Sequence, residues 1–245
     1  MKYFLETVET IERNVGFEQY DVIHLAWLLL FLVTTVVNCI IYHRLGSVGR
    51  SRWEKTVAVL LIADELFKEI CLIIGGRYTV QYLPFHLCSI NIFLIAANAW
   101  KKKTVINNFL YTVCIPGTMA ALLFPSWTEL PLGNFMHIHS FTVHILLALY
   151  PIVLAVNGVL KPRAKDIPRC LLLLLAMAGF AYIFNLLFDT NFMFLMSASK
   201  GNPLYLFKKM WGSHLLGFPV IIAGVLVVMY VPLVLYRKCR RKLTS

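Results

Sequence analysis

The run FMHIHSFTVHILLALYPIVLAVN, residues 135–157, decides the fold, because it is long and apolar yet carries three histidines near its start. A helix needs about 20 predominantly apolar residues to cross the hydrocarbon core of a bilayer. Backbone groups in lipid must be paired within the segment, so a run of this kind forms a helix and not a strand. The stretch therefore predicts a transmembrane helix with polar side chains in one half.

Six further runs have the same apolar character, although polar residues interrupt the runs 83–100 and 105–124. The six runs are 22–42, 53–75, 83–100, 105–124, 167–188 and 214–236. Together with 135–157 they predict seven transmembrane helices. Composition agrees, since 59% of the 245 residues are hydrophobic and 14% are charged, whereas a soluble domain has about 25% charged residues. This excludes an ordinary water-soluble enzyme and a disordered chain. We expect an all-α, polytopic membrane protein with a single seven-helix domain over residues 21–245.

The basic residues are distributed unevenly between the segments that connect these runs. The loops after the first, third and fifth runs and the tail after the seventh hold most of the 23 Lys and Arg residues. Because positively charged loops stay in the cytoplasm, we predict that the N-terminus is outside and the C-terminus inside. The net charge of +11 is then a topology signal in the cell membrane, and we expect no nucleic-acid partner.

Two segments outside the runs are predicted to lie at the outer membrane surface. Residues 1–20 are amphipathic, with Phe4, Leu5, Val8, Ile11 and Val15 on one helical face, and predict an interfacial helix. Residues 189–213 are partly apolar and predict an external cap.

Charged side chains interrupt the run 53–75. Ionisable groups inside a membrane are costly and usually face an interior cavity, which makes each one a candidate for a functional site. The i,i+4 spacing of Asp64 and Lys68 favours an ion pair between them. Glu65 and Glu69 would then need a histidine or arginine from another helix.

Histidine, cysteine and amide side chains lie near the predicted outer ends of three other runs. Pro84 suits the first turn of a helix, which leaves free backbone N–H groups close to the following histidine and cysteine. His137 and His139 are interpreted as interfacial, whereas His144 lies among apolar residues. Asn185 and Asp189 form a polar stripe at the end of the run 167–188, and helix capping by Asp189 or Asn191 explains part of it. The topology places a group of polar residues at similar depth, around one pocket that opens toward the outer leaflet, with Glu65 deeper: Glu69, His86, Cys88, His144, Asn185 and Asp189.

Two short segments carry a resemblance to a known family. LPFHLCS, residues 83–89, resembles the LP-x-HLC segment of the YwaF-like family of bacterial multi-pass membrane proteins, and TNFMFL, residues 190–195, is similar to its TNYMFL segment. That family looks related to a eukaryotic membrane acyltransferase that builds polyunsaturated ether phospholipids, and more distantly to intramembrane hydrolases of fatty-acid esters of hydroxy fatty acids. The resemblance implies an acyltransferase or lipid hydrolase with Cys88 as nucleophile and His144 as base.

The resemblance also implies membrane lipids, phospholipid or lysophospholipid, as partners, while residues 200–203 and 211–214 depart from the family pattern. The residues expected to support the reaction are Glu65, Glu69, His86, Asn185, Asp189 and Asn191. Asn185, Asn191 or free backbone N–H groups would hold the developing oxyanion, and Glu69 or Asp189 would orient His144.

Two alternatives use the same polar pocket. A proton-coupled transporter or a receptor would use the charged residues of the second run. A metal-dependent hydrolase would use His86, His144 and Asp189, but the chain has neither an HExxH motif nor a zinc spacing of its six cysteines. We therefore predict no metal site and no cofactor. The sequence leaves the oligomeric state open.

Overall fold

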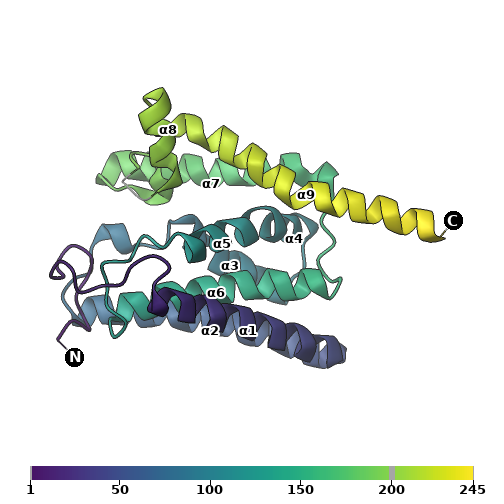
Figure 1. Cartoon of the computed structure of the whole chain (residues 1–245), viewed down its shortest axis with the longest axis horizontal. Helices are drawn as coiled ribbons and strands as arrows, with labels where there is room; N and C mark the ends of the chain where they lie inside the picture. The colour runs from purple at the N-terminus through teal and green to yellow at the C-terminus, as the bar shows by residue number, and fades with distance from the viewer. Residues whose placement is uncertain (1, 199–201, 245) are drawn as a thin grey trace.

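The computed structural model describes residues 2–198 and 202–244, with side chains up to residue 235. Within these ranges the chain forms helices and turns and no strand, which confirms the all-α class. The α-helices are α1 (Val22–Arg44), α2 (Ser47–Ile74), α3 (Leu87–Trp100), α4 (Thr104–Phe109), α5 (Ile115–Leu123), α6 (Phe135–Val156), α7 (Ile167–Phe188), α8 (Pro203–Trp211) and α9 (Gly217–Thr244). In Figure 1 the two termini lie at opposite ends of the molecule.

Five helical segments are long and apolar enough to cross a membrane, and this agrees with a multi-pass protein. They are Val22–Arg44, Thr104–Leu123, Phe135–Val156, Ala164–Phe188 and His214–Leu235. The second of them joins α4 to α5 through a π-helical segment, Leu110–Cys114. The other two predicted spans correspond to α3, which has only 14 residues, and to α2, which carries the charged cluster. The count of seven and the orientation stay predictions.

Helix α6 is the centre of the bundle. Of its most apolar stretch 61% is buried inside the protein, against 17% for α1 and 6% for α9. It packs against α1, α2, α3 and α5, whereas α7 and α9 lie toward the outside of the molecule in Figure 1. The histidines that begin the α6 run are therefore held in the protein interior and do not face lipid.

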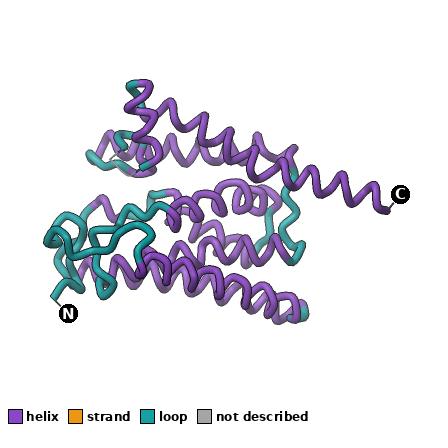
Figure 2. Tube along the Cα trace, viewed as in Figure 1, coloured by secondary structure: helices purple, strands orange, loops and turns teal. Residues whose placement is uncertain are grey.

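The N-terminal segment differs from the prediction, because residues 2–20 form a series of turns and not an amphipathic helix. Figure 2 shows these turns among the loops gathered at one end of the bundle. Asn14 and Tyr20 adopt positive φ angles, which a helix does not permit. The backbone of the segment bonds to other parts of the chain, as where Phe135 N–H donates to the Phe4 carbonyl at 3.1 Å. Tertiary hydrogen bonds have thus outweighed the local apolar periodicity.

Asn134 fixes both this segment and the start of α6. Its Oδ1 accepts the backbone N–H groups of Met136 and His137, at 2.9 and 3.2 Å, and so caps the helix. Its Nδ2 donates to the carbonyls of Tyr3 and Glu6, at 2.7 and 2.8 Å. The side chain is fully buried, and no pattern in the sequence marked it.

We expect Asn134→Ala to destabilise the protein by about 1–3 kcal/mol, because it removes a helix cap and two hydrogen bonds to the carbonyls of the N-terminal segment. Thermal unfolding in detergent micelles measures the effect. Asn202→Ala is the matched control, since Asn202 caps α8 through Leu204 N–H alone and should cost about 1 kcal/mol or less. Equal losses for the two variants would contradict the assignment.

The opposite end of the bundle also contains buried polar side chains, which the sequence did not suggest. Glu54 accepts from Tyr42 Oη at 2.6 Å and from Lys102 Nζ at 2.9 Å. Asn98 accepts from Tyr150 Oη at 3.0 Å. Each of these buried groups has a hydrogen-bond partner on another segment, so the bonds stabilise the packing of neighbouring helices.

Candidate functional site

The structure brings Cys88 and His144 together. Cys88 is the second residue of α3, His144 lies in the middle of α6, and Cys88 Sγ is 3.2 Å from His144 Nε2. The two helices pack against each other. This is hydrogen-bond distance for a sulfur donor, so the side chains form a Cys–His pair of the kind that activates a nucleophile.

A backbone carbonyl sets the orientation of the imidazole. His144 Nδ1 is 2.6 Å from the carbonyl oxygen of Ser140, one turn earlier on α6. A carbonyl oxygen can only accept, so Nδ1 carries the proton and the lone pair of Nε2 faces the thiol. His144 is therefore in the tautomer of a general base. The predicted orientation by Glu69 or Asp189 is wrong, because α6 itself supplies the acceptor.

Cys88 lies at the N-terminus of α3, where backbone N–H groups have no intrahelical acceptor. The helix begins at Leu87, three residues after Pro84, and its N-cap residue His86 makes no side-chain cap hydrogen bond. The first helical bond joins Ile90 N–H to the His86 carbonyl at 3.0 Å. The predicted position of Pro84 in the first turn is wrong, but free N–H groups beside the cysteine are present. Partial positive charge at this helix end favours an anion next to Sγ.

Trp127, in the loop between α5 and α6, covers one face of the imidazole. Its ring stacks on His144, with ring centroids 5.2 Å apart and an interplanar angle of 15°. It also meets Phe141 edge to face at 5.2 Å. Sequence reasoning missed Trp127, because a single tryptophan in a loop carries no periodic or motif signal.

The charged residues of α2 form a network that differs from the predicted pairing. Lys68 Nζ binds Glu65 Oε1 at 2.6 Å and Glu69 Oε1 at 3.0 Å. Asp64 is 3.2 Å from His139 Nδ1 on α6 and accepts from Thr142 Oγ1 at 2.9 Å. The predicted Asp64–Lys68 pair is therefore wrong. Lys68 pairs with both of the glutamates that were expected to lack a local partner.

This network stands beside the Cys–His pair rather than within it. His139 Nε2 also approaches Glu65 Oε2, at 3.7 Å, so α2 and α6 are joined by charge as well as by apolar packing. His139 and His137 are both buried, and the prediction that they are interfacial is wrong. His137 accepts from Trp27 Nε1 at 2.9 Å and holds the Leu130 carbonyl with its other nitrogen. Neither histidine contacts Cys88.

The predicted polar residues at the end of α7 belong to the turn that leads into the cap segment. Asn185 is buried, accepts from Phe192 N–H at 2.8 Å and donates to the Phe192 carbonyl at 3.0 Å. Asp189 ends α7 in the left-handed region, with φ 50°. Asn191 bonds to Ser197. All three fix the turn that carries the TNFMFL segment.

The cap contacts the start of α3 through His86. Met193 N–H donates to His86 Nδ1 at 3.3 Å, and the imidazole packs edge to face against Phe192, with centroids 5.1 Å apart. Met193 and Phe194 both have positive φ angles, 58° and 56°, and such backbone costs energy for residues other than glycine. The structure thus joins the two sequence segments that carried the family resemblance.

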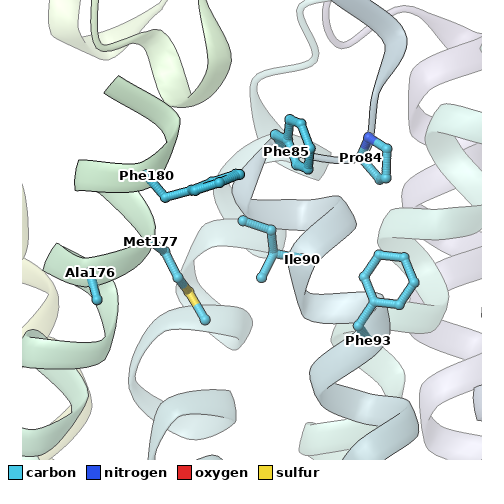
Figure 3. Close-up of a pocket in the computed structure, with 7 residues that line it drawn as sticks. All are labelled: Pro84, Phe85, Ile90, Phe93, Ala176, Met177 and Phe180. Atoms are coloured by element: carbon cyan, nitrogen blue, oxygen red, sulfur yellow. The ribbon is translucent and has the colours of Figure 1, made fainter. Parts of the chain in front are cut away.

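An apolar groove of about 530 Å³ lies between α3 and α7. Figure 3 shows Ile90 of α3 facing Met177 and Phe180 of α7 across it, and Phe93 also lines the groove. Ile90 is two residues beyond Cys88 and so projects from a different side of the helix. None of the predicted polar site residues lines this groove. Nor do three or more His, Cys, Asp or Glu side chains among the described residues form a group that could hold a metal ion.

Comparison with known proteins gives one match. The model of the TMEM164 family matches residues 18–230, which include every helix from α1 to α8 and the Cys–His pair. No curated protein and no solved structure matches the chain.

Proposed function

Because the chain belongs to the TMEM164 family of multi-pass membrane proteins, we propose that it acts on lipids within the membrane, as an acyltransferase or lipid hydrolase of the outer leaflet. The observation that carries the proposal is the 3.2 Å contact between Cys88 Sγ and His144 Nε2. A nucleophile and a base at this distance, with the base in the correct tautomer, are the parts that acyl transfer requires.

The reaction begins when Cys88 Sγ attacks the carbonyl carbon of a lipid ester. His144 Nε2 takes the thiol proton as the S–C bond forms, and the carbonyl oxygen becomes an oxyanion. The C–O bond of the ester then breaks, and the protonated His144 gives its proton to the leaving alcohol oxygen. The product is a thioester on Cys88 and a lipid with one free hydroxyl group.

The second half repeats these steps with an oxygen nucleophile. His144 removes a proton from the hydroxyl group of a lysophospholipid or from water, the new C–O bond forms, and the Cys88 sulfur leaves and recovers its proton. A lipid acceptor gives transfer and water gives hydrolysis. In both halves the N–H groups at the start of α3 donate to the oxyanion under this proposal.

An acyl-directed electrophilic probe tests the proposal on the purified protein. We expect Cys88→Ala to abolish covalent labelling, because the sulfur that forms the bond is absent. Cys71→Ala is the control, since Cys71 is a buried cysteine of α2 in a different apolar cluster, and its labelling should equal that of the unsubstituted chain. Unchanged labelling of Cys88→Ala would overturn the proposal and favour the transporter alternative, for which the α2 network supplies the charged groups.

A further inference from the structure

The indole nitrogen of Trp127 is buried and makes no hydrogen bond to any residue that the structure describes. The side chain is 8% exposed. An indole N–H can only donate, and a buried donor without an acceptor costs free energy. Native proteins pair nearly all such groups, so this donor requires an explanation.

The other tryptophans of the chain show that the arrangement is specific to Trp127. Trp27 Nε1 donates to His137 at 2.9 Å, and Trp53 Nε1 donates to Asn38 Oδ1 at 2.8 Å. Trp100 and Trp211 are about half exposed, so water can accept from them. Trp127 alone combines burial with an unpaired N–H.

The unpaired donor belongs to the side chain that stacks on the proposed base. The Trp127 and His144 rings are 5.2 Å apart, and His144 in turn is 3.2 Å from Cys88 Sγ. The imidazole therefore contacts both side chains, the indole on its face and the thiol at Nε2. A lipid ester attacked by Cys88 Sγ would bring its two oxygen atoms, both hydrogen-bond acceptors, beside these side chains.

We propose that the Trp127 N–H is a hydrogen-bond donor to the lipid ester, and that it binds the carbonyl oxygen as negative charge develops there. The inference rests on the proposed acyl transfer at Cys88. It assigns a side-chain donor to an oxyanion site that otherwise consists of α3 backbone N–H groups. A donor with no partner in the free protein needs no rearrangement when the oxyanion forms, which is the condition for effective stabilisation.

The N-terminal segment holds this loop in place. Phe17 N–H donates to the Thr128 carbonyl at 2.8 Å. Gly16 lies so close that a Cβ atom there would meet the Thr128 carbonyl oxygen and the Glu129 backbone. Contact between the two segments therefore requires glycine, and it fixes the residue directly after Trp127.

Trp127→Phe tests the inference, because phenylalanine keeps an aromatic ring against His144 but lacks the N–H. The full chain in detergent micelles receives a phospholipid with a fluorescent acyl chain, and thioester formation on Cys88 is followed over time. Alkylation of Cys88 by iodoacetamide is measured in parallel, since that reaction develops no oxyanion. We expect thioester formation to slow by about 10²–10³-fold while alkylation keeps its rate.

Trp27→Phe is the matched control, because Trp27 belongs to the same apolar cluster and its N–H donates to His137, which is not a member of the Cys–His pair. Its thioester formation should equal that of the unsubstituted chain. If Trp127→Phe folds poorly, benzothienylalanine at position 127 replaces it, because this residue exchanges the N–H for sulfur at nearly constant shape. It should likewise slow thioester formation and leave alkylation unchanged.

Thioester formation at the unsubstituted rate in Trp127→Phe would overturn the inference, and so would an equal loss of acylation and alkylation, which indicates packing alone. Failure of the proposed function looks different. In that case the unsubstituted chain itself forms no thioester that depends on Cys88.

Discussion

Replacing His144 with alanine is expected to lower the rate of acyl transfer to Cys88 by about 10²–10⁴-fold, the range that a positioned general base contributes. The physical reason is the 3.2 Å contact, in which Nε2 is the acceptor that faces the thiol. Without it, the proton has to leave the sulfur for solvent that a bundle interior does not supply. Thioester formation from a fluorescent phospholipid measures the loss.

His137→Ala is the control for this variant. His137 lies two turns earlier on α6 and is also buried, but its partners are Trp27 and the Leu130 carbonyl. We expect it to reduce stability and to leave the rate per folded molecule unchanged. If His144→Ala kept the unsubstituted rate, the Cys–His pair would be a packing contact and not a catalytic one.

Lys68→Met is expected to destabilise the protein by about 3–5 kcal/mol, the cost of removing one partner from a buried ion pair. Lys68 lies between Glu65 and Glu69, and its side chain is only 7% exposed. Without its charge, the carboxylates of Glu65 and Glu69 would lose the ammonium group that pairs with both. Thermal unfolding in micelles, followed by circular dichroism, measures the effect.

Lys55→Met is the matched control on the same helix. Lys55 is exposed and lies 6.0 Å from the Trp100 ring, so its loss should cost within about 0.5 kcal/mol. Adding Glu65→Gln to Lys68→Met should restore part of the stability, since one uncompensated charge disappears. Similar costs at positions 55 and 68, or no recovery in the double variant, would contradict the network.

The apolar runs predicted the helices well because hydrophobic length is a local property of the chain. The membrane-spanning class and the approximate positions of the long helices therefore followed from the sequence, and Cys88 at the start of α3 lies against His144 in the middle of α6. The boundaries were less certain. α2 begins at Ser47, ahead of the apolar run, because polar residues can continue a helix beyond the bilayer core.

The errors have a common cause, which is that the deciding partner lies on another element. Lys68 pairs with glutamates on both sides of it along α2, and Asp64 pairs instead with His139 of α6. The N-terminal segment has helical periodicity, yet the Asn134 side chain donates hydrogen bonds to two of its carbonyls, which holds it in another conformation. Trp127 reaches the site from a loop. None of these partners is visible in a local pattern.

The bond between His144 Nδ1 and the Ser140 carbonyl bears on how such a site is discovered. In many Cys–His enzymes a third side chain accepts the hydrogen bond from the imidazole, and replacing that side chain lowers activity and so identifies it. Here the acceptor belongs to the main chain, so Ser140→Ala would leave it untouched. A systematic alanine scan of α6 would therefore identify only Cys88 partner residues such as His144. The main-chain carbonyl that fixes the tautomer of the imidazole would not be detected by any single replacement.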